Sequence, residues 1–90
     1  MDRDAFEAAL RRDGFTVVNG GQPPGHVFEP HAHDVDLRIL VLGGHITLTR
    51  DGVAETFRPG EHCEIPAGCP HAEVVGPEGV AYILGRRAPA

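Results

Sequence analysis

The sequence lacks the segments that mark membrane and secreted proteins. No apolar run approaches the length that is needed to span a bilayer. The first residues, Met1–Asp4, are charged and no apolar stretch follows them, so no signal peptide is visible. We therefore expect a cytoplasmic protein that does not bind membranes, in which Cys63 and Cys69 are reduced thiols.

Basic residues and paired cysteines are also scarce. Eight basic residues stand against 13 acidic ones, giving a formal net charge of −5, so we expect no nucleic-acid-binding surface. The two cysteines do not form a CxxC pair, which disfavours a zinc site built from thiolates. The 90 residues suffice for one domain with a modest core, and chains of this size often gain stability from a metal or a partner subunit.

Residues 2–12 predict a short helix, which Asp2 or Asp4 can cap at its start. One apolar stripe of this helix is expected to pack on the rest of the chain: Phe6, Ala9 and Leu10. We expect residues 1–13 to form this helix and residues 14–90 to form a barrel, the two making a single domain.

After the helix, short segments typical of strands alternate with turn signals every eight to twelve residues, which predicts an all-β sandwich or barrel of about eight strands. The expected strands are residues 15–18, 26–33, 36–42, 45–50, 53–57, 62–65, 71–75 and 80–84. The expected turns and loops between and after them are residues 19–25, Gly43-Gly44, Asp51-Gly52, residues 76–79 and a loose tail at 86–90.

His31-Ala32-His33 is the first candidate for chemistry. On a strand these two imidazoles would point the same way, and neutral imidazole is the commonest metal ligand. Taken alone, such a triplet is more often two solvated histidines on a loop than a metal site. A second segment, Gly60-x5-Pro66-x-Gly68-x2-His71, predicts a tight bend that aims a third histidine from a distant part of the chain. Together the two segments predict a metal site.

These two segments resemble the two motifs of the cupin superfamily, in its small single-domain form. The matching residues are Gly25, His31, His33 and Gly44 in the first motif and Gly60, Pro66, Gly68 and His71 in the second. The resemblance covers residues 25–75. It implies a double-stranded β-helix, that is, a jelly-roll barrel, with a metal inside one end. By the same resemblance, the metal ligands are His31, His33 and His71.

The chain departs from the family pattern at the acidic ligand. Leu37 occupies the position of the family's glutamate, and leucine cannot bind a metal. Asp36 would face the other way on a regular strand unless a bulge turns it inward. Glu73 is two residues after His71 and should share its face of the strand. It is a candidate metal ligand, acid–base group or hydrogen-bond partner of a ligating imidazole. The alternative is a residue at the rim of the barrel that is bound to water. The sequence leaves open whether Asp36 or Glu73 completes the site. Val75, at the position of the family's asparagine, is expected in the barrel wall.

Other polar residues near the motifs have simpler expected roles. Cys69 is expected beside the site as a small buried residue, and Tyr82 in the wall with its hydroxyl hydrogen-bonded. On residues 62–65 the apolar pair, Cys63 and Ile65, should face inward, leaving His62 and Glu64 outside. Two further histidines are expected on exposed loops or strand ends: His26 and His45.

Three imidazoles leave at least one coordination position open, as in catalytic sites. The expected ion is a divalent transition metal: zinc, iron, nickel, manganese or copper. The resemblance implies a metal-dependent enzyme with dioxygenase-, isomerase- or lyase-like chemistry on a small organic molecule in the barrel. The alternative is a non-catalytic module that binds a small ligand or senses a metal and works as a dimer. The sequence assigns no catalytic residue and does not decide whether the chain is an enzyme.

Residues 37–42 favour a partner subunit, because five of the six are apolar and only Arg38 is polar. A strand that is apolar on both faces needs cover on both. In so small a barrel, few segments of the same chain are available to cover the outer face of this strand. We therefore expect a homodimer.

Overall fold

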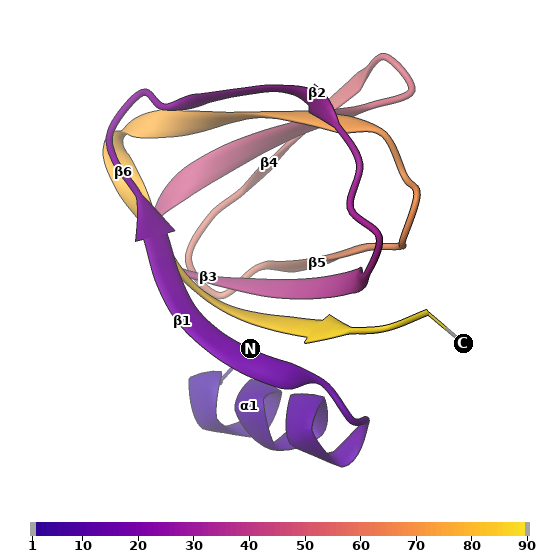
Figure 1. Cartoon of the computed structure of the whole chain (residues 1–90). Helices are drawn as coiled ribbons and strands as arrows, with labels where there is room; N and C mark the ends of the chain where they lie inside the picture. Colours follow the sequence, from indigo (N-terminus) through magenta and orange to yellow (C-terminus); the bar gives the residue numbers. More distant parts are fainter. Residues whose placement is uncertain (1, 90) are drawn as a thin grey trace.

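The computed structural model describes residues 2–89, which form two β-layers with a helix against the outside of one of them (Figure 1). The elements are α1 (Arg3–Arg12), β1 (Thr16–Gln22), β2 (Val27–His31), β3 (Asp36–Arg50), β4 (Val53–Phe57), β5 (His62–Ile65) and β6 (His71–Arg87). Within the described residues, no helix is long and apolar enough to cross a membrane.

Two long, bent strands, β3 and β6, take part in both layers. The first part of β6, residues 71–75, pairs with β2 and with the second part of β3. The second part of β6, residues 80–87, pairs with β1 and with the first part of β3. Next to β3, β4 extends one layer and β5 the other, and every pairing is antiparallel. This is the predicted jelly-roll arrangement, and the all-β fold is confirmed.

The strands are fewer and longer than the sequence predicted. Gly43-Gly44 does not close a hairpin but lies inside β3, where two bulges shift its register against β6. Residues 76–79, predicted as a turn, lie inside β6. The eight expected strands therefore merge into six. The reason is that a glycine with positive φ, such as Gly44 at 65° and Gly79 at 80°, serves a bulge or bend as readily as a turn.

Two further boundaries differ from the prediction because backbone pairing extends the strands. β1 continues to Gln22, through part of the stretch predicted as turns, since it pairs with β6 along its whole length. β6 includes Arg86 and Arg87, which were expected in a loose tail, since these residues pair with β1 and β3. The last residue of that predicted tail, Ala90, lies outside the described residues.

The predicted hairpin at Asp51-Gly52 is confirmed. It joins β3 to β4, with Arg50 opposite Val53. Both central residues have positive φ, 50° for Asp51 and 76° for Gly52. This is the conformation of the tight turn that best matches the twist of two antiparallel strands.

Helix α1 covers the outer face of the layer that contains β1 and the first part of β3 (Figure 1). Asp2 caps it, accepting a hydrogen bond from the backbone nitrogen of Ala5 at 3.2 Å. Its buried side chains form one cluster with the strands: Phe6, Leu10, Phe15, Leu40 and Ile83. The expectation that little within the chain would cover this face of β3 is therefore wrong, because the helix covers it.

Phe15 fixes the end of the helix to the sheet. The guanidinium carbons of Arg38 and Arg87 each lie 4.4 Å from the centroid of its ring. Arg38 also pairs with the Asp13 carboxylate at 2.7 Å and lowers its pKa, and Arg87 donates to the Asp13 carbonyl at 2.8 Å. Both arginines are thus committed to the outside of the barrel.

Gly44 allows the two bent strands to approach closely, which predicts a large cost for any side chain there. A Cβ on Gly44 would overlap the carbonyl oxygen of Gly79, whereas a Cβ on Gly52 would meet nothing within 4 Å. Both glycines have positive φ. We expect Gly52→Ala to lower the free energy of unfolding by about 1 kcal/mol, the cost of the backbone conformation alone, and Gly44→Ala by about 3 kcal/mol or more. Urea unfolding measures both values, and equal losses would contradict the close approach.

Candidate metal centre

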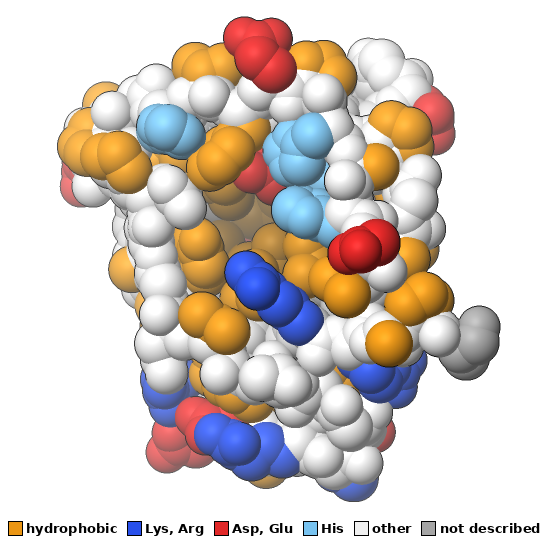
Figure 2. Space-filling model, viewed as in Figure 1, with side chains coloured by type: hydrophobic (Ala, Val, Ile, Leu, Met, Phe, Trp, Pro, Cys, Tyr) orange, Lys and Arg blue, Asp and Glu red, His pale blue; other side chains and the backbone are white. Residues whose placement is uncertain are grey.

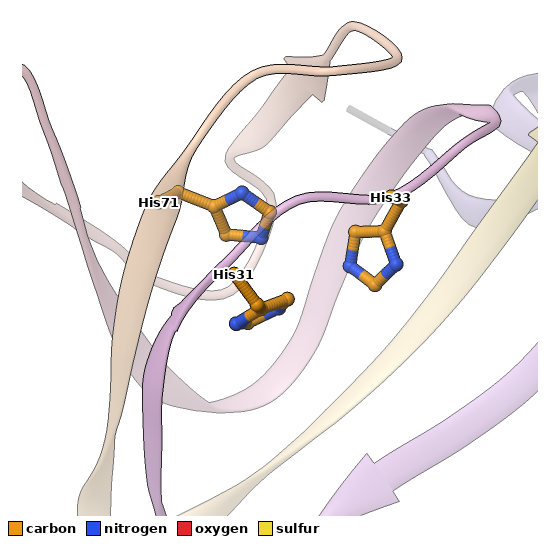
Figure 3. Close-up of side chains that lie close together, drawn as sticks. All are labelled: His31, His33 and His71. Carbon is orange, nitrogen blue, oxygen red and sulfur yellow. The ribbon is translucent and has the colours of Figure 1, made fainter.

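His31, His33 and His71 come together at one end of the barrel, with their rings turned toward one another (Figure 3). One ligand atom from each lies within 4.8 Å of the others. The ring centroids are 4.9 Å apart for His31 and His33, 4.4 Å for His31 and His71, and 5.3 Å for His33 and His71. Three nitrogens so close can reach one ion with small side-chain adjustments, since metal–nitrogen bonds are about 2 Å long.

The local structure that brings them together differs in one respect from the prediction. His31 is the last residue of β2 and lies opposite His71, the first residue of β6. His33 follows the end of β2, so the His-Ala-His triplet does not lie on one strand. The two rings converge because the chain leaves the sheet between them, and not because of strand alternation.

Hydrogen bonds to backbone carbonyls orient two of the rings. Nδ1 of His31 donates to the carbonyl of Glu29 at 2.7 Å, and Nδ1 of His71 donates to the carbonyl of Cys69 at 2.9 Å. In a neutral imidazole that donates through Nδ1, Nε2 carries the lone pair. Such bonds from the far side of the ring are the usual way in which metal-binding histidines are held. Nε2 is therefore the ligand atom that these two residues offer.

The Nε2 atom of His71 is the most informative atom of the cluster. His71 is 2% exposed, and its Nε2 has no hydrogen-bond partner among the described residues. A buried polar atom without a partner costs about 1–3 kcal/mol. A carboxylate oxygen of Glu73 lies 3.4 Å from it, and a nitrogen lone pair and a carboxylate oxygen repel each other. A cation beside both groups removes the cost and the repulsion, so these residues fit a metal ion.

The imidazole of His33 is held in the neutral form. Its pKa is lowered, first because burial disfavours the charged ring, and then because His31 and His71 lie close by. Only a neutral imidazole can donate its lone pair to a metal. Three imidazole nitrogens, with a carboxylate oxygen beside them, form a donor set that divalent transition metals accept.

Two histidines of the cluster, His31 and His33, line a cavity of about 410 Å³ between the two layers. Figure 2 shows this hollow, with hydrophobic side chains in its depth and histidines at its edge. Its apolar wall includes Leu37, Ile39, Val41, Ile46, Leu48, Phe57, Cys63 and Leu84. Burial raises the pKa of the Cys63 thiol to about 11, so this wall carries no charge at neutral pH. Its polar lining consists of Gln22, His31, His33, Asp34, Glu73, Tyr82 and Arg86.

The structure distinguishes between the two candidate carboxylates. Asp36 accepts a hydrogen bond from the backbone nitrogen of Ala67 at 2.9 Å and lies 3.9 Å from Arg87, outside the cavity. Its neighbour Leu37 lines the cavity, as strand alternation requires. Glu73 lines the cavity beside the cluster. It does not orient the His71 ring through Nδ1, because the Cys69 carbonyl already does so.

Most of the remaining candidate residues lie where the sequence placed them. Val75 is buried in the core, and half-buried Tyr82 accepts a hydrogen bond from Gln22 at 3.3 Å. Half-buried Cys69 packs against the core. On β5, Cys63 and Ile65 are buried and His62 and Glu64 are exposed.

One of the two remaining histidines differs from its expected place. His26 is exposed before β2, as predicted. His45, which was also expected to be exposed, is half-buried within the bulged part of β3. Its ring fills the space that a side chain at position 76 would need, and Gly76 leaves that space free.

Three polar residues that line the cavity were not identified from the sequence: Gln22, Asp34 and Arg86. For Arg86 a signal exists in strand alternation. Tyr82, Leu84 and Arg86 occupy every second position of the strand, and all three line the cavity. A strand predicted to continue past Leu84 would have placed Arg86 on the inner face.

Comparisons with known proteins agree with this geometry. The sequence model of the Cupin domain matches residues 21–83. Dimethylsulfoniopropionate lyase DddW of Ruegeria pomeroyi is 39% identical over 79 residues, which cover 88% of this chain and 51% of that protein. Quercetin 2,3-dioxygenase of Bacillus subtilis is 39% identical over 70 residues, covering 77% of this chain and 18% of that protein. The chain thus spans about half the length of the first relative and less than a fifth of the second.

Solved structures show the same fold. A protein of unknown function from Rhizobium leguminosarum superposes with a TM-score of 0.78 at 25% identity, covering 86% of this chain and 73% of that one. An RmlC-like cupin from Shewanella frigidimarina superposes with a TM-score of 0.70 at 25% identity, covering 84% of this chain and 67% of that one.

Proposed function

This chain belongs to the cupin family, and from that premise we propose that it is a metal-dependent enzyme acting on a small organic molecule in the barrel cavity. The proposed ligands are His31, His33 and His71, and the proposed ion is divalent zinc, iron, nickel, manganese or copper. One observation carries the proposal: the buried Nε2 of His71 has no hydrogen-bond partner in the described part of the chain and lies 3.4 Å from the carboxylate of Glu73.

Lyase-like chemistry is the reaction class that we favour. The relative that shares 39% identity over 88% of this chain is a lyase, and the dioxygenase matches over a smaller part. An elimination needs a base that removes a proton from carbon while the leaving group departs with its bonding electrons. This step requires no oxidant, and a metal bound at the histidines would supply electrophilic activation of the reacting molecule.

Glu73 is the residue that we propose as the base. Its side chain is only 12% exposed, and it reaches the cavity beside the cluster. Its carboxylate oxygen would receive the proton from the molecule in the cavity. Much of the cavity wall is apolar, and an apolar surrounding strengthens the interaction between the charged groups and the bound molecule. Tyr82 lines the same cavity and positions the molecule through its hydroxyl.

We also propose that the protein is a cytoplasmic homodimer. Helix α1 covers one layer, but the outer face of the other layer carries exposed apolar side chains. Val27 and Val74 are direct neighbours across β2 and β6 and are 55% and 49% exposed. A second copy packed on this face would remove both from water.

The dimer proposal predicts that Val74→Arg gives a monomer, because burying an unpaired charge in a small apolar interface is costly. Sedimentation equilibrium at micromolar concentration should show a dimer for the unmodified chain and for Val18→Arg, which changes an exposed valine of β1 in the other layer. A monomeric unmodified chain would contradict the dimer.

The metal site predicts about one metal ion per chain in protein purified without added metal. We expect His31→Ala and His71→Ala to lower the content at least tenfold, since each removes a ligand. His62→Ala is the matched control, because His62 is exposed on β5, away from the cluster, and should leave the content unchanged. Elemental analysis measures all four proteins. Full retention of metal in either cluster variant would remove that histidine from the site.

If Glu73 is the base, its replacement should lower the rate of turnover without changing metal binding. Glu73→Gln keeps the size of the side chain but cannot accept the proton, so we expect kcat to fall at least 100-fold with the metal content unchanged. Dimethylsulfoniopropionate is the first substrate to test, and its consumption can be followed by proton NMR. Glu55→Gln on β4 is the control and should keep full activity. Loss of metal from Glu73→Gln would instead make Glu73 a ligand and end its assignment as the base.

A further inference from the structure

We propose that Arg86 binds a carboxylate of the molecule that occupies the cavity, so that the substrate class of this site is small organic acids. The inference rests on the proposed function only in taking the cavity as the substrate site. It concerns the side of the cavity that β6 forms at its C-terminal end, and nothing in the histidine cluster is needed for it.

Strand alternation separates Arg86 from the arginine that follows it. Arg86 lines the cavity together with Leu84 and Tyr82, whereas Arg87 lies on the outer face over the ring of Phe15. Figure 2 shows a basic side chain at the edge of the hollow, across from histidines. Arg86 and Arg87, which are adjacent in β6, therefore lie on opposite faces of the same layer.

The pairing of the arginines differs in the same way. Arg38 and Arg87 both stack on Phe15 and are bonded to Asp13. Arg86 forms no ion pair or side-chain hydrogen bond with the described residues, although the acidic residues Asp34 and Glu73 also line the cavity. Arg86 is exposed and lines the cavity, so among the described residues no other side chain occupies its guanidinium.

The chemistry of this donor group selects the ligand. A guanidinium presents several N–H donors in a planar fork that matches the two oxygens of a carboxylate. The wall next to it is apolar, and a cavity of about 410 Å³ has the size of a small-molecule site. In a molecule with a short carbon chain and one carboxylate, the carboxylate can bind the guanidinium and the carbon chain can pack against the apolar wall. Glu73 and Asp34 disfavour further negative charge elsewhere on the ligand.

Butanoate and butanamide are suitable probes, because they have nearly the same size and differ in charge. We expect the unmodified protein to bind butanoate about tenfold more tightly than butanamide. Arg86→Gln should abolish this preference. Arg58→Gln should keep it, because Arg58 is an exposed arginine outside the cavity lining. Chemical-shift titration of ¹⁵N-labelled protein measures the dissociation constants, and thermal unfolding checks that both variants are folded.

The same titration on protein with its metal removed by a chelator separates this inference from the proposed function. A preference that depends on Arg86 and persists without metal supports the carboxylate site, even if elemental analysis finds no metal in the purified protein. A preference that disappears with the metal, that survives Arg86→Gln, or that is absent from the unmodified protein overturns the inference. In each of those cases the metal content of the histidine variants still tests the metal site on its own.

Discussion

Antiparallel pairing between β3 and β6 is the constraint on which the other features of this molecule depend. It runs from Asp36 opposite Arg87 at one end to Thr49 opposite Ala72 at the other. Both strands bend where Gly44 and Gly79 meet, so one pair of strands contributes to both layers. The cavity is the space that this bend encloses. The bend therefore also sets the positions of the cavity residues that lie on β6 on either side of it.

The chemistry of the site follows from an imbalance in hydrogen bonding. The described part of the structure gives the Nδ1 atoms of His31 and His71 firm partners and leaves the Nε2 of His71 buried with none. Proteins rarely leave a buried nitrogen in this state unless a ligand or ion satisfies it. The carboxylate of Glu73 sharpens the imbalance, because it adds negative charge where a lone pair already points. The family's acidic ligand position is taken by Leu37, and the carboxylate that lies 3.4 Å from His71, that of Glu73, comes from β6.

The sequence predicted correctly those features that depend on local residue patterns or on the spacing of motif residues. The capped helix, the Asp51-Gly52 hairpin and the inward face of β5 were predicted from local patterns and are confirmed. The spacing of the two motifs implied that the three histidines share one centre. In the described structure, one ligand atom of each lies within 4.8 Å of the others.

The sequence failed where distant parts of the chain decide the outcome. Gly43-Gly44 has the composition of a turn, and only its pairing with β6 makes it a bulge. The choice between Asp36 and Glu73 depended on whether β3 is regular near Asp36, and only its pairing with β5 and β6 shows that it is, so that Leu37 and not Asp36 turns inward. Arg86 was assigned to a tail because the last strand was predicted to end at Leu84, and the pairing that extends it joins Arg86 to β1 and β3, which are far away in the sequence. The cover that α1 gives to Leu40 is likewise a contact between remote segments.

The long pairing of β3 with β6 also has a consequence for how the chain folds. Apart from α1 and the hairpin of β3 with β4, the pairings described here join residues that are far apart in sequence. Closing such large loops costs chain entropy before any contact repays it, and topologies of this kind fold in milliseconds to seconds. The histidine cluster needs β6 in place beside β2, so the end of the barrel that carries the cluster is completed only after this slow search has succeeded.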